Sequence, residues 1–151
     1  MGTPLGRIAI PDGVGIKAAD AAFAFWKRQV LSDFTEQVDT LVPIGIQLDW
    51  VPHSELKTLG YKADIENQNW VMTTGVDPHI DRGWGHTLIW VLVNDGMHFK
   101  QGRNKYVHAV GEWFIFDDSV LHCVDIHNAV QKQAVFLGWA VKIGAVSCVA
   151  P

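Results

Sequence analysis

The spacing of hydrophobic positions changes near Pro43 and divides the chain into two regions. Before that proline, within residues 12–41, apolar side chains recur at the three- and four-residue intervals of one helix face. The members of this stripe are Ala21, Ala22, Phe25, Trp26, Val30 and Leu31. Asp20 or the preceding GVG stretch marks the expected start of the helix, and Pro43 marks its expected end. We therefore predict a helix that packs one face against the rest of the fold.

Beyond Pro43 the chain contains short apolar runs rich in β-branched and aromatic residues, which is typical of strands. These runs are IGIQLDW (44–50), NWVMTTGV (69–76), HTLIWVLV (86–93), EWFIF (112–116) and QAVFLGWAVKI (133–143). Turn-forming segments separate them, namely VPHSE, DPHIDRGWG, NDGMH, KQGRNK and DDSV. A helical region followed only by strands favours an antiparallel β domain with helical cover.

Length and composition restrict the class of protein. The 151 residues suit one domain, and 12 basic against 16 acidic residues give a formal net charge of −4 with no basic tract, so no nucleic-acid footprint is evident. Two cysteines, Cys123 and Cys148, are too few for a disulfide scaffold. The N-terminus MGTPLGRIAI lacks the apolar stretch of a secretory signal, and no apolar run approaches the roughly 18 residues of a membrane span. We expect a soluble, cytoplasmic protein of unknown oligomeric state that does not act at a membrane.

The segment GVDPHIDRGWGH (75–86) concentrates metal-binding residue types between two apolar runs. The spacing of His79 and Asp81 is weak evidence alone, because the chain also contains His53-Ser54-Glu55. On an extended segment, however, residues i and i+2 point to one side about 6.6 Å apart, so both can reach one ion. His122, which follows the apolar run GEWFIF and a turn, is the candidate third ligand. Two histidines and one carboxylate on one face form the facial triad of non-haem Fe(II) oxygenases.

Three segments in this order resemble the double-stranded β-helix core of the Fe(II)/2-oxoglutarate-dependent dioxygenases. They are PHIDRGWGHTLIWVLVND, GEWFIFDDSVLHCVDI and the lysine of QKQAVFLGWAV. The second is most similar to the aspartyl/asparaginyl β-hydroxylases, whereas the complete His-x-Asp pair is more similar to the prolyl hydroxylases. The resemblance covers about half of the chain, from Trp70 to Lys142. It implies a mainly β, double-stranded β-helix (jelly-roll, cupin-like) core over 43–145. With the length of the chain and the helical pattern before Pro43, this gives one domain, residues 1–151, with a helical N-terminal region (1–42).

The resemblance also implies roles for individual residues. His79, Asp81 and His122 would hold Fe(II) and form the catalytic centre, at which 2-oxoglutarate and dioxygen react. Lys132, ten positions after His122, would bind the far carboxylate of 2-oxoglutarate. Most relatives carry an arginine there, and a lysine offers a point charge instead of a bidentate fork. Residues that could replace Lys132 as the anchor are Arg82, Arg103 and Lys100.

Residues beside the expected ligands form a second group of candidates. Those expected to contact the co-substrate are Asn69, Thr73 and Thr87. Those expected to line a substrate pocket are Arg82, Trp84, His86 and Trp90. For all of these, packing within the barrel is the alternative interpretation. Several of the seven tryptophans flank the polar segment, which is consistent with a walled pocket.

The reaction implied by the resemblance is hydroxylation of an amino-acid side chain in a peptide or protein, or of a small amino-acid-like molecule. Asp81 favours hydroxylation, because halogenating relatives lack that carboxylate. One alternative is a non-catalytic jelly-roll module that binds or inhibits a partner and retains the metal. Another is a cupin-type metal enzyme that does not use 2-oxoglutarate. The three expected ligands are also residue types that are common in surface turns.

Overall fold

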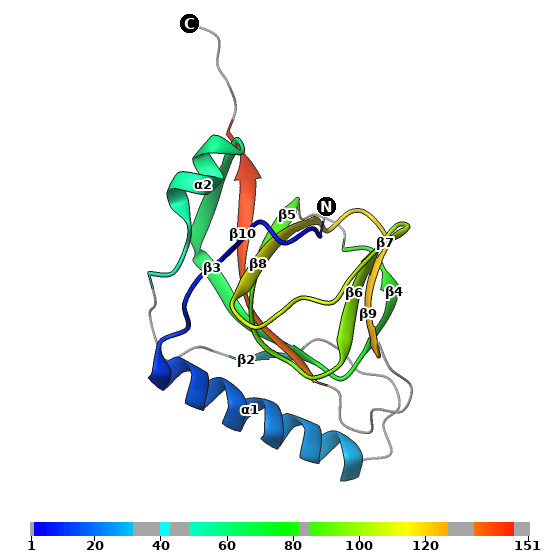
Figure 1. The fold of residues 1–151 in the computed structure, drawn as a ribbon. Coiled ribbons are helices and arrows are strands. Elements are labelled where there is room, and N and C mark those ends of the chain that lie inside the picture. Colours follow the sequence, from blue (N-terminus) through cyan, green and yellow to red (C-terminus); the bar gives the residue numbers. More distant parts are fainter. Residues whose placement is uncertain (1, 32–39, 43–48, 82–84, 127–134, 147–151) are drawn as a thin grey trace, which may run out of the picture.

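The computed structural model describes residues 2–31, 40–42, 49–81, 85–126 and 135–146, which form a mainly β fold of two antiparallel sheets (Figure 1). The six-stranded sheet has the order β1 (Gly6–Arg7), β8 (Glu112–Asp117), β5 (His86–Asn94), β10 (Phe136–Ala145), β3 (Tyr61–Thr73) and β2 (Thr40–Val42). The four-stranded sheet has the order β4 (Val76–His79), β9 (His122–Ile126), β6 (Met97–Gln101) and β7 (Asn104–Tyr106). The prediction of an antiparallel β fold with helical cover is confirmed.

The central strands of the six-stranded sheet are buried on both faces. Successive side chains on a strand point to opposite sides, so each strand supplies two separate layers of packing. One layer, the outer core, lies under the helices and includes Leu88, Trp90, Leu92, Leu137 and Trp139. The other, the inner core, lies between the two sheets and includes Ile89, Val91, Met97, Phe99, Phe114, Phe116, Phe136 and Ala140. Both sheets contribute to the inner core, so it holds them face to face.

Helix α1 (Asp12–Leu31) covers the outer face of the six-stranded sheet. Among its described side chains, the buried ones are Val14, Ala18, Ala22 and Phe25, at the spacing of one helix face. Of the predicted stripe, the side chains of Trp26, Val30 and Leu31 lie outside the description. The helix begins at Asp12, earlier than Asp20, because the amides of Val14 and Gly15 already donate to the carbonyl of Pro11. In the described part of the chain, no helix is long and apolar enough to cross a membrane.

The predicted end of that helix at Pro43 is wrong. Thr40–Val42 forms the edge strand β2, which pairs antiparallel with Trp70–Met72 of β3. The predicted helical N-terminal region, 1–42, contains α1 together with the short strands β1 and β2. The segment TLV carries β-branched residues, and a free sheet edge offers it the backbone partners that a helix would otherwise supply.

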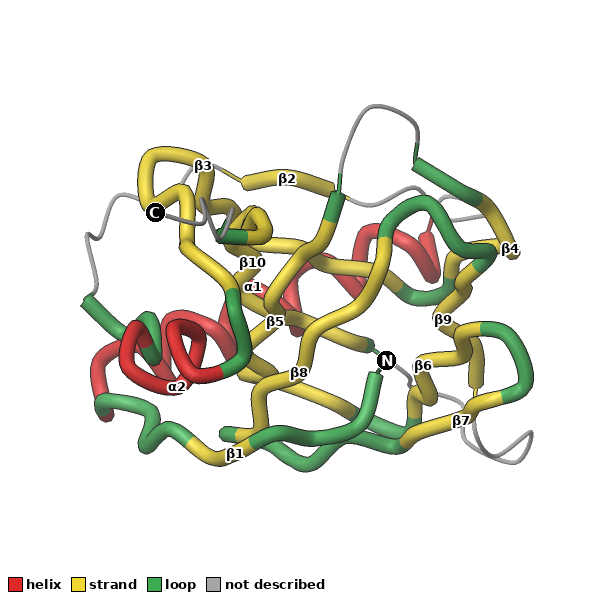
Figure 2. The backbone as a smooth tube through the Cα atoms, turned by 90° about the horizontal axis from the view of Figure 1, so that it is seen from above, coloured by secondary structure: helices red, strands yellow, loops and turns green. Residues whose placement is uncertain are grey.

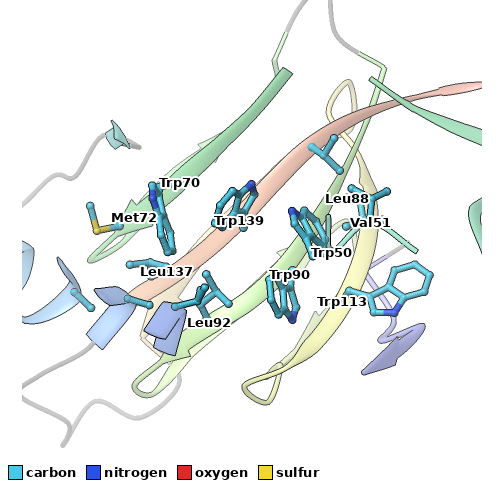
Figure 3. Packing of buried hydrophobic residues seen from close by; sticks show 14 of the residues in the cluster. Trp50, Val51, Trp70, Met72, Leu88, Trp90, Leu92, Trp113, Leu137 and Trp139 are labelled. Atoms are coloured by element: carbon cyan, nitrogen blue, oxygen red, sulfur yellow. The ribbon is translucent and has the colours of Figure 1, made fainter. Parts of the chain in front are cut away.

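The five tryptophans whose side chains the structure describes belong to the outer core, whereas Trp84, within the polar segment, lies outside the described residues. Figure 3 shows Trp50, Trp70, Trp90, Trp113 and Trp139 along one side of the six-stranded sheet. Trp50 stacks on Trp90 with ring centroids 5.2 Å apart, and Trp70 lies 4.9 Å from Trp139. Burying each such ring stabilises the fold by roughly 3 kcal/mol, so these tryptophans stabilise the outer face of the six-stranded sheet.

Several segments predicted as turns carry regular structure. The four-stranded sheet takes β6 and β7 from NDGMH and KQGRNK, and β4 from DPHIDRGWG. VPHSE begins helix α2 (His53–Thr58), whose Leu56 is buried in the outer core. Seen from above in Figure 2, the four-stranded sheet and α2 lie at opposite sides of the molecule. The predicted turn at Asn94-Asp95-Gly96 is confirmed, with Gly96 at a φ of 76° between β5 and β6.

Candidate metal centre and cavity

Backbone pairing brings the two candidate histidine ligands together. His79 at the end of β4 and His122 at the start of β9 are directly opposite each other in the antiparallel register. Such cross-strand partners have their Cβ atoms about 5 Å apart. Asp81 lies two residues past His79, and its backbone amide donates to the carbonyl of Asp118 (2.9 Å) in the turn before β9. The segment that carries His79 and Asp81 is thus held both by β9 and by the turn that precedes β9.

The three side chains converge on one point. Their potential ligand atoms all lie within 4.8 Å of one another. Nε2 of His122 is 3.4 Å from one carboxylate oxygen of Asp81, and Nε2 of His79 is 3.7 Å from the other. Ligand atoms about 2.1 Å from one ion and at right angles to each other would be about 3 Å apart. Small side-chain movements are therefore enough to place all three on a single divalent ion.

The opposite ring nitrogens of both histidines are bound to the backbone. Nδ1 of His79 lies 2.7 Å from the carbonyl oxygen of Asp77, and Nδ1 of His122 lies 2.8 Å from that of Val120. A carbonyl only accepts, so each Nδ1 carries the proton and each Nε2 presents its lone pair toward Asp81. Metal-binding histidines have this arrangement, because it fixes both tautomer and ring orientation. The donor set fits a divalent transition metal.

A cavity of about 300 Å³ lies next to this candidate metal centre, between the two sheets. All three candidate ligands contribute to its wall. Val71, Ile89, Phe99, Phe116 and Phe136 supply much of the apolar lining. The arrangement gives a metal-binding group at one side of a largely apolar chamber, which limits how much water can surround a bound molecule.

Three residues predicted to contact a co-substrate, Asn69, Thr73 and Thr87, line this cavity. Thr73 is fully buried, and its hydroxyl oxygen accepts the amide of Gly75 (2.9 Å). Thr87 donates its hydroxyl proton to the carboxylate of Asp118 (2.8 Å). The alternation of β3 and β5 turns all three toward the inner side of the sheet. Their contact with a co-substrate stays a prediction.

Two residues predicted to line a substrate pocket lie elsewhere. Trp90 belongs to the outer core, where its indole donates to the carbonyl of Ile8 (3.1 Å). His86 shares that face of β5, with its ring 5.2 Å from Tyr61 and its Nε2 4.0 Å from Asp117. The prediction is wrong for both, because residues 86 and 90 have the opposite parity to Thr87 and Ile89 on the same strand. Arg82 and Trp84 are outside the described residues.

The predicted co-substrate anchor, Lys132, also lies outside the described residues. Of its suggested replacements, Lys100 on β6 and Arg103 in the following turn are exposed and do not line the cavity. The lysine that does line it, Lys142 on β10, was not among the predicted site residues. Its ammonium is 3.1 Å from the Asp118 carboxylate and 2.8 Å from the Thr87 hydroxyl. The sequence did carry a signal for Lys142. It lies an even number of residues from Phe136 and Ala140 on the same strand, so the three side chains point to the same face of the sheet.

Two further ionisable groups beside the site, Asp117 and Cys123, have pKa values shifted from their ordinary ones. The hydroxyl and amide of Ser119 both donate to Asp117, which lowers the pKa of that carboxyl. These bonds fix the turn that leads into His122. Burial raises the pKa of the Cys123 thiol, which follows His122 and lines the cavity. A protonated thiol is a weak metal ligand, so the structure favours the imidazole and carboxylate donors.

No protein-family model and no curated protein sequence matches this chain. Among solved structures, it is similar to AviO1 from Streptomyces viridochromogenes Tue57, with a TM-score of 0.51 and 12% identity over 98% of this chain and 90% of that chain. Protein NMB1881 from Neisseria meningitidis matches with a TM-score of 0.39 and 9% identity over 79% of this chain and 96% of that one. The first similarity concerns the fold alone, and the second is too low to indicate a shared fold.

Proposed function

We propose that this protein is an Fe(II)- and 2-oxoglutarate-dependent dioxygenase that hydroxylates an amino-acid side chain of a peptide or protein, or a small amino-acid-like molecule. The observation that carries the proposal is the convergence of His79, Asp81 and His122, with both Nδ1 atoms held by backbone carbonyls. Three ligands from one side leave part of the coordination sphere of an octahedral ion open for other molecules. That geometry suits iron-dependent oxygen chemistry.

The order of the strands supports a double-stranded β-helix. From β3 to β10 the chain alternates between the six-stranded and the four-stranded sheet, except that β6 and β7 are consecutive strands of the latter. Eight strands in two facing antiparallel sheets make up a jelly roll. In this interpretation β1, β2 and the helices are additions around the barrel. The fold similarity to AviO1 is compatible with it.

The cavity supports binding of a small co-substrate. Its volume of about 300 Å³ lies at the lower end of the range for ligand pockets, which suits a molecule the size of 2-oxoglutarate. When bound, iron and 2-oxoglutarate would supply the oxidation, in which dioxygen yields the hydroxylated substrate, succinate and carbon dioxide. The chain's own residues would orient the metal through His79, Asp81 and His122. The apolar lining would exclude water, while the resemblance assigns the carboxylate anchor to Lys132.

An anaerobic titration tests the proposal directly. Adding 2-oxoglutarate to the Fe(II)-loaded protein should produce a weak visible absorption band, and admitting oxygen with a panel of peptides and amino-acid derivatives should release succinate. His122→Ala and Asp81→Ala should remove both signals, because each deletes a metal ligand. His53→Ala is the matched control, since His53 is an exposed histidine on α2. No absorption band and no succinate from the wild-type protein would refute the proposal.

A metal enzyme that does not use 2-oxoglutarate is the second candidate. It is favoured by the described part of the cavity wall, where Lys142 is the lysine or arginine side chain present and is paired with Asp118. In that case Lys142 would serve a carboxylate of the substrate, and no second lysine or arginine in the described part of the wall would be left for the far carboxylate of 2-oxoglutarate. Isothermal titration of Mn(II)-loaded protein with 2-oxoglutarate separates the two candidates. Heat with one-to-one stoichiometry supports the dioxygenase, and its absence supports the second candidate.

A further inference from the structure

A buried polar cluster lies in the cavity wall beside the candidate metal centre. Asp118 is 1% exposed, and one of its carboxylate oxygens accepts both the Thr87 hydroxyl (2.8 Å) and the Lys142 ammonium (3.1 Å). The ammonium also donates to the Thr87 oxygen (2.8 Å). A buried carboxylate needs such a counter-ion. The lysine side chain, however, is 25% exposed and forms part of the cavity lining, so a molecule in the cavity can contact it.

An irregularity in β3 brings two amide side chains onto the same wall. Val141 pairs with Gln68 while the next residue, Lys142, pairs with Asp64, so β3 carries extra residues opposite Lys142. Bulges of this kind redirect side chains and occur often beside functional sites. Asn67, within this bulge, and Asn69, just after it, both line the cavity. Within the described part of the chain, neither side-chain amide has a hydrogen bond in the structure.

The bulge is held from the opposite face. The side-chain oxygen of Gln68 accepts the indole N–H groups of both Trp50 (2.9 Å) and Trp139 (3.1 Å) in the outer core. Its amide nitrogen donates to the carbonyl of Ile65 (2.8 Å) inside the bulge. Gln68 therefore fixes the strand with its neighbours Asn67 and Asn69 on the cavity side. This is a rigid support for two amide side chains that make no hydrogen bond within the described residues.

The cluster lies at the metal end of the cavity. The carbonyl of Asp118 accepts the amide of the candidate ligand Asp81 (2.9 Å). Lys142 pairs with Thr87 at the start of β5, whereas Phe136 pairs with Asn94 at its end. The polar residues are thus close to the metal ligands, and Phe136 lies at the far end of the same strands. A molecule bound to the cluster would lie beside the metal.

We propose that Lys142, Asn67 and Asn69 form a subsite for a carboxylate group of the substrate. An ammonium and two amide NH₂ groups all offer N–H donors, and a carboxylate is the acceptor that such a set binds most strongly. Thr87 and Asp118 position the lysine. The subsite rests on the proposed function for its catalytic meaning, and it specifies the substrate class: an amino-acid-like molecule or side chain that carries a free carboxylate.

Matched acid and amide probes test the subsite without catalysis. The probes are N-acetyl-L-amino acids and the corresponding N-acetyl-L-amino acid amides, titrated into the Zn(II)-loaded protein and followed by ¹H–¹⁵N spectra. The acid should bind about tenfold more tightly than its amide, because the charge-assisted bonds are lost in the amide. The side-chain signals of Asn67 and Asn69 should shift with the acid. Equal affinity of acid and amide, or no binding by any probe at millimolar concentration, would overturn the proposal.

Variants identify the residues responsible. Lys142→Met leaves Asp118 without its counter-ion and is liable to unfold, so the double variant Lys142→Met/Asp118→Asn is used to keep the cluster neutral. It and Asn67→Ala should lose the preference for acids, by about tenfold and a few-fold respectively, with amide and zinc affinities unchanged. Lys62→Met, at an exposed lysine on β3, is the control. An unchanged preference in the double variant would overturn the proposal.

The outcome is separable from that of the proposed function. Probe binding is measured without iron, 2-oxoglutarate or oxygen, so it does not depend on turnover. Acid preference without succinate release in the aerobic assay would leave the subsite standing and refute the dioxygenase. Succinate release without acid preference would refute the subsite alone.

Discussion

His108 illustrates how the fold fixes the protonation state of one side chain. Its ring is 2% exposed and stacks on Phe114 with centroids 3.8 Å apart. Nε2 lies 2.6 Å from the carbonyl oxygen of Gly2, so it carries the proton and ties the N-terminal segment to the inner core. Nδ1 is buried with no hydrogen-bond partner in the described part of the chain. A second proton would have no acceptor there.

Because of His108, the folded protein should therefore become less stable as the pH falls. Burial lowers the pKa of His108 in the folded protein, while the unfolded chain keeps an ordinary value of about 6.5. Below that pH the unfolded chain binds a proton that the folded protein does not, which favours unfolding by up to about 1.4 kcal/mol per pH unit until the folded pKa is reached. Urea unfolding of wild type and His108→Gln should show a smaller loss of stability between pH 7.5 and pH 5.5 in the variant.

A matched control guards against general acid effects. His53 is exposed on α2, so His53→Gln should leave the pH dependence as it is in the wild-type protein. An equal loss of stability in wild type and His108→Gln would contradict the argument.

Gly138 allows β10 to lie close to β5 beneath the cavity. A Cβ atom at this position would be 2.5 Å from the Cγ2 of Ile89, 3.3 Å from the ring of Phe136 and 3.4 Å from the backbone oxygen of Trp90. Ile89 is β-branched and packed, so its methyl group has little room to move. Gly138→Ala should destabilise the protein by about 1–3 kcal/mol in urea unfolding.

A double-mutant cycle identifies the cause. Ile89→Ala removes the contacting methyl group, so the cost of Gly138→Ala should be smaller in the Ile89→Ala background. Equal costs in the two backgrounds would show that the clash with Ile89 is not responsible.

At the scale of elements, the bulge of β3 depends on Gln68 as described above. Gln68→Met keeps the side-chain volume but leaves the indole N–H groups of Trp50 and Trp139 without their acceptor. Each unsatisfied donor costs about 1–3 kcal/mol where it is buried, so the midpoint of urea unfolding should fall markedly. The exposed neighbour Glu66 gives a control, because Glu66→Gln should have little effect. A Gln68→Met variant as stable as wild type would contradict the proposed support of the bulge.

The elements that the sequence predicts well are those buried on both faces. β5, β8 and β10 appear as continuous apolar runs because one face enters the outer core and the other enters the inner core. The strands of the four-stranded sheet are short and polar on their solvent side, so MHFKQ and NKY have the composition of turns. Their strand conformation is stabilised by pairing with distant segments, which no local pattern records.

The same distinction applies to the candidate site. The convergence of His79, Asp81 and His122 is confirmed. It could be predicted because a resemblance in the order of motifs, unlike a local pattern, relates segments that are distant in the sequence. Trp90 was expected to line the pocket. Successive side chains on β5 point to opposite faces, however, and Trp90 lies on the face that enters the outer core. Lys142 was not predicted as a site residue, because its contacts with Thr87 and Asp118 depend on the register of β10 against β5. Residue types predict the chemistry, and register decides which of them meet.

At the scale of the whole molecule, the candidate metal centre joins β9 to the end of β4 and to the connection that follows β4. β4 is an edge strand whose pairing with β9 is irregular between Val76 and His79. A bound ion would cross-link these segments in the folded state alone. At a metal concentration one hundred times the Kd, the expected stabilisation is about 2.7 kcal/mol. For a chain of this length, that corresponds to a rise in Tm of roughly 5–10 °C.

Thermal unfolding with Mn(II), Fe(II) under anaerobic conditions, and Zn(II) measures this effect, and EDTA should reverse it. His122→Ala should abolish the rise in Tm, since it removes the most buried of the three ligands. His53→Ala should retain it, because His53 lies on α2, outside the candidate centre. An equal rise in His122→Ala would mean that the metal binds elsewhere on the protein. Because the readout is stability and not turnover, it tests the metal centre independently of the co-substrate, of the substrate and of any reaction.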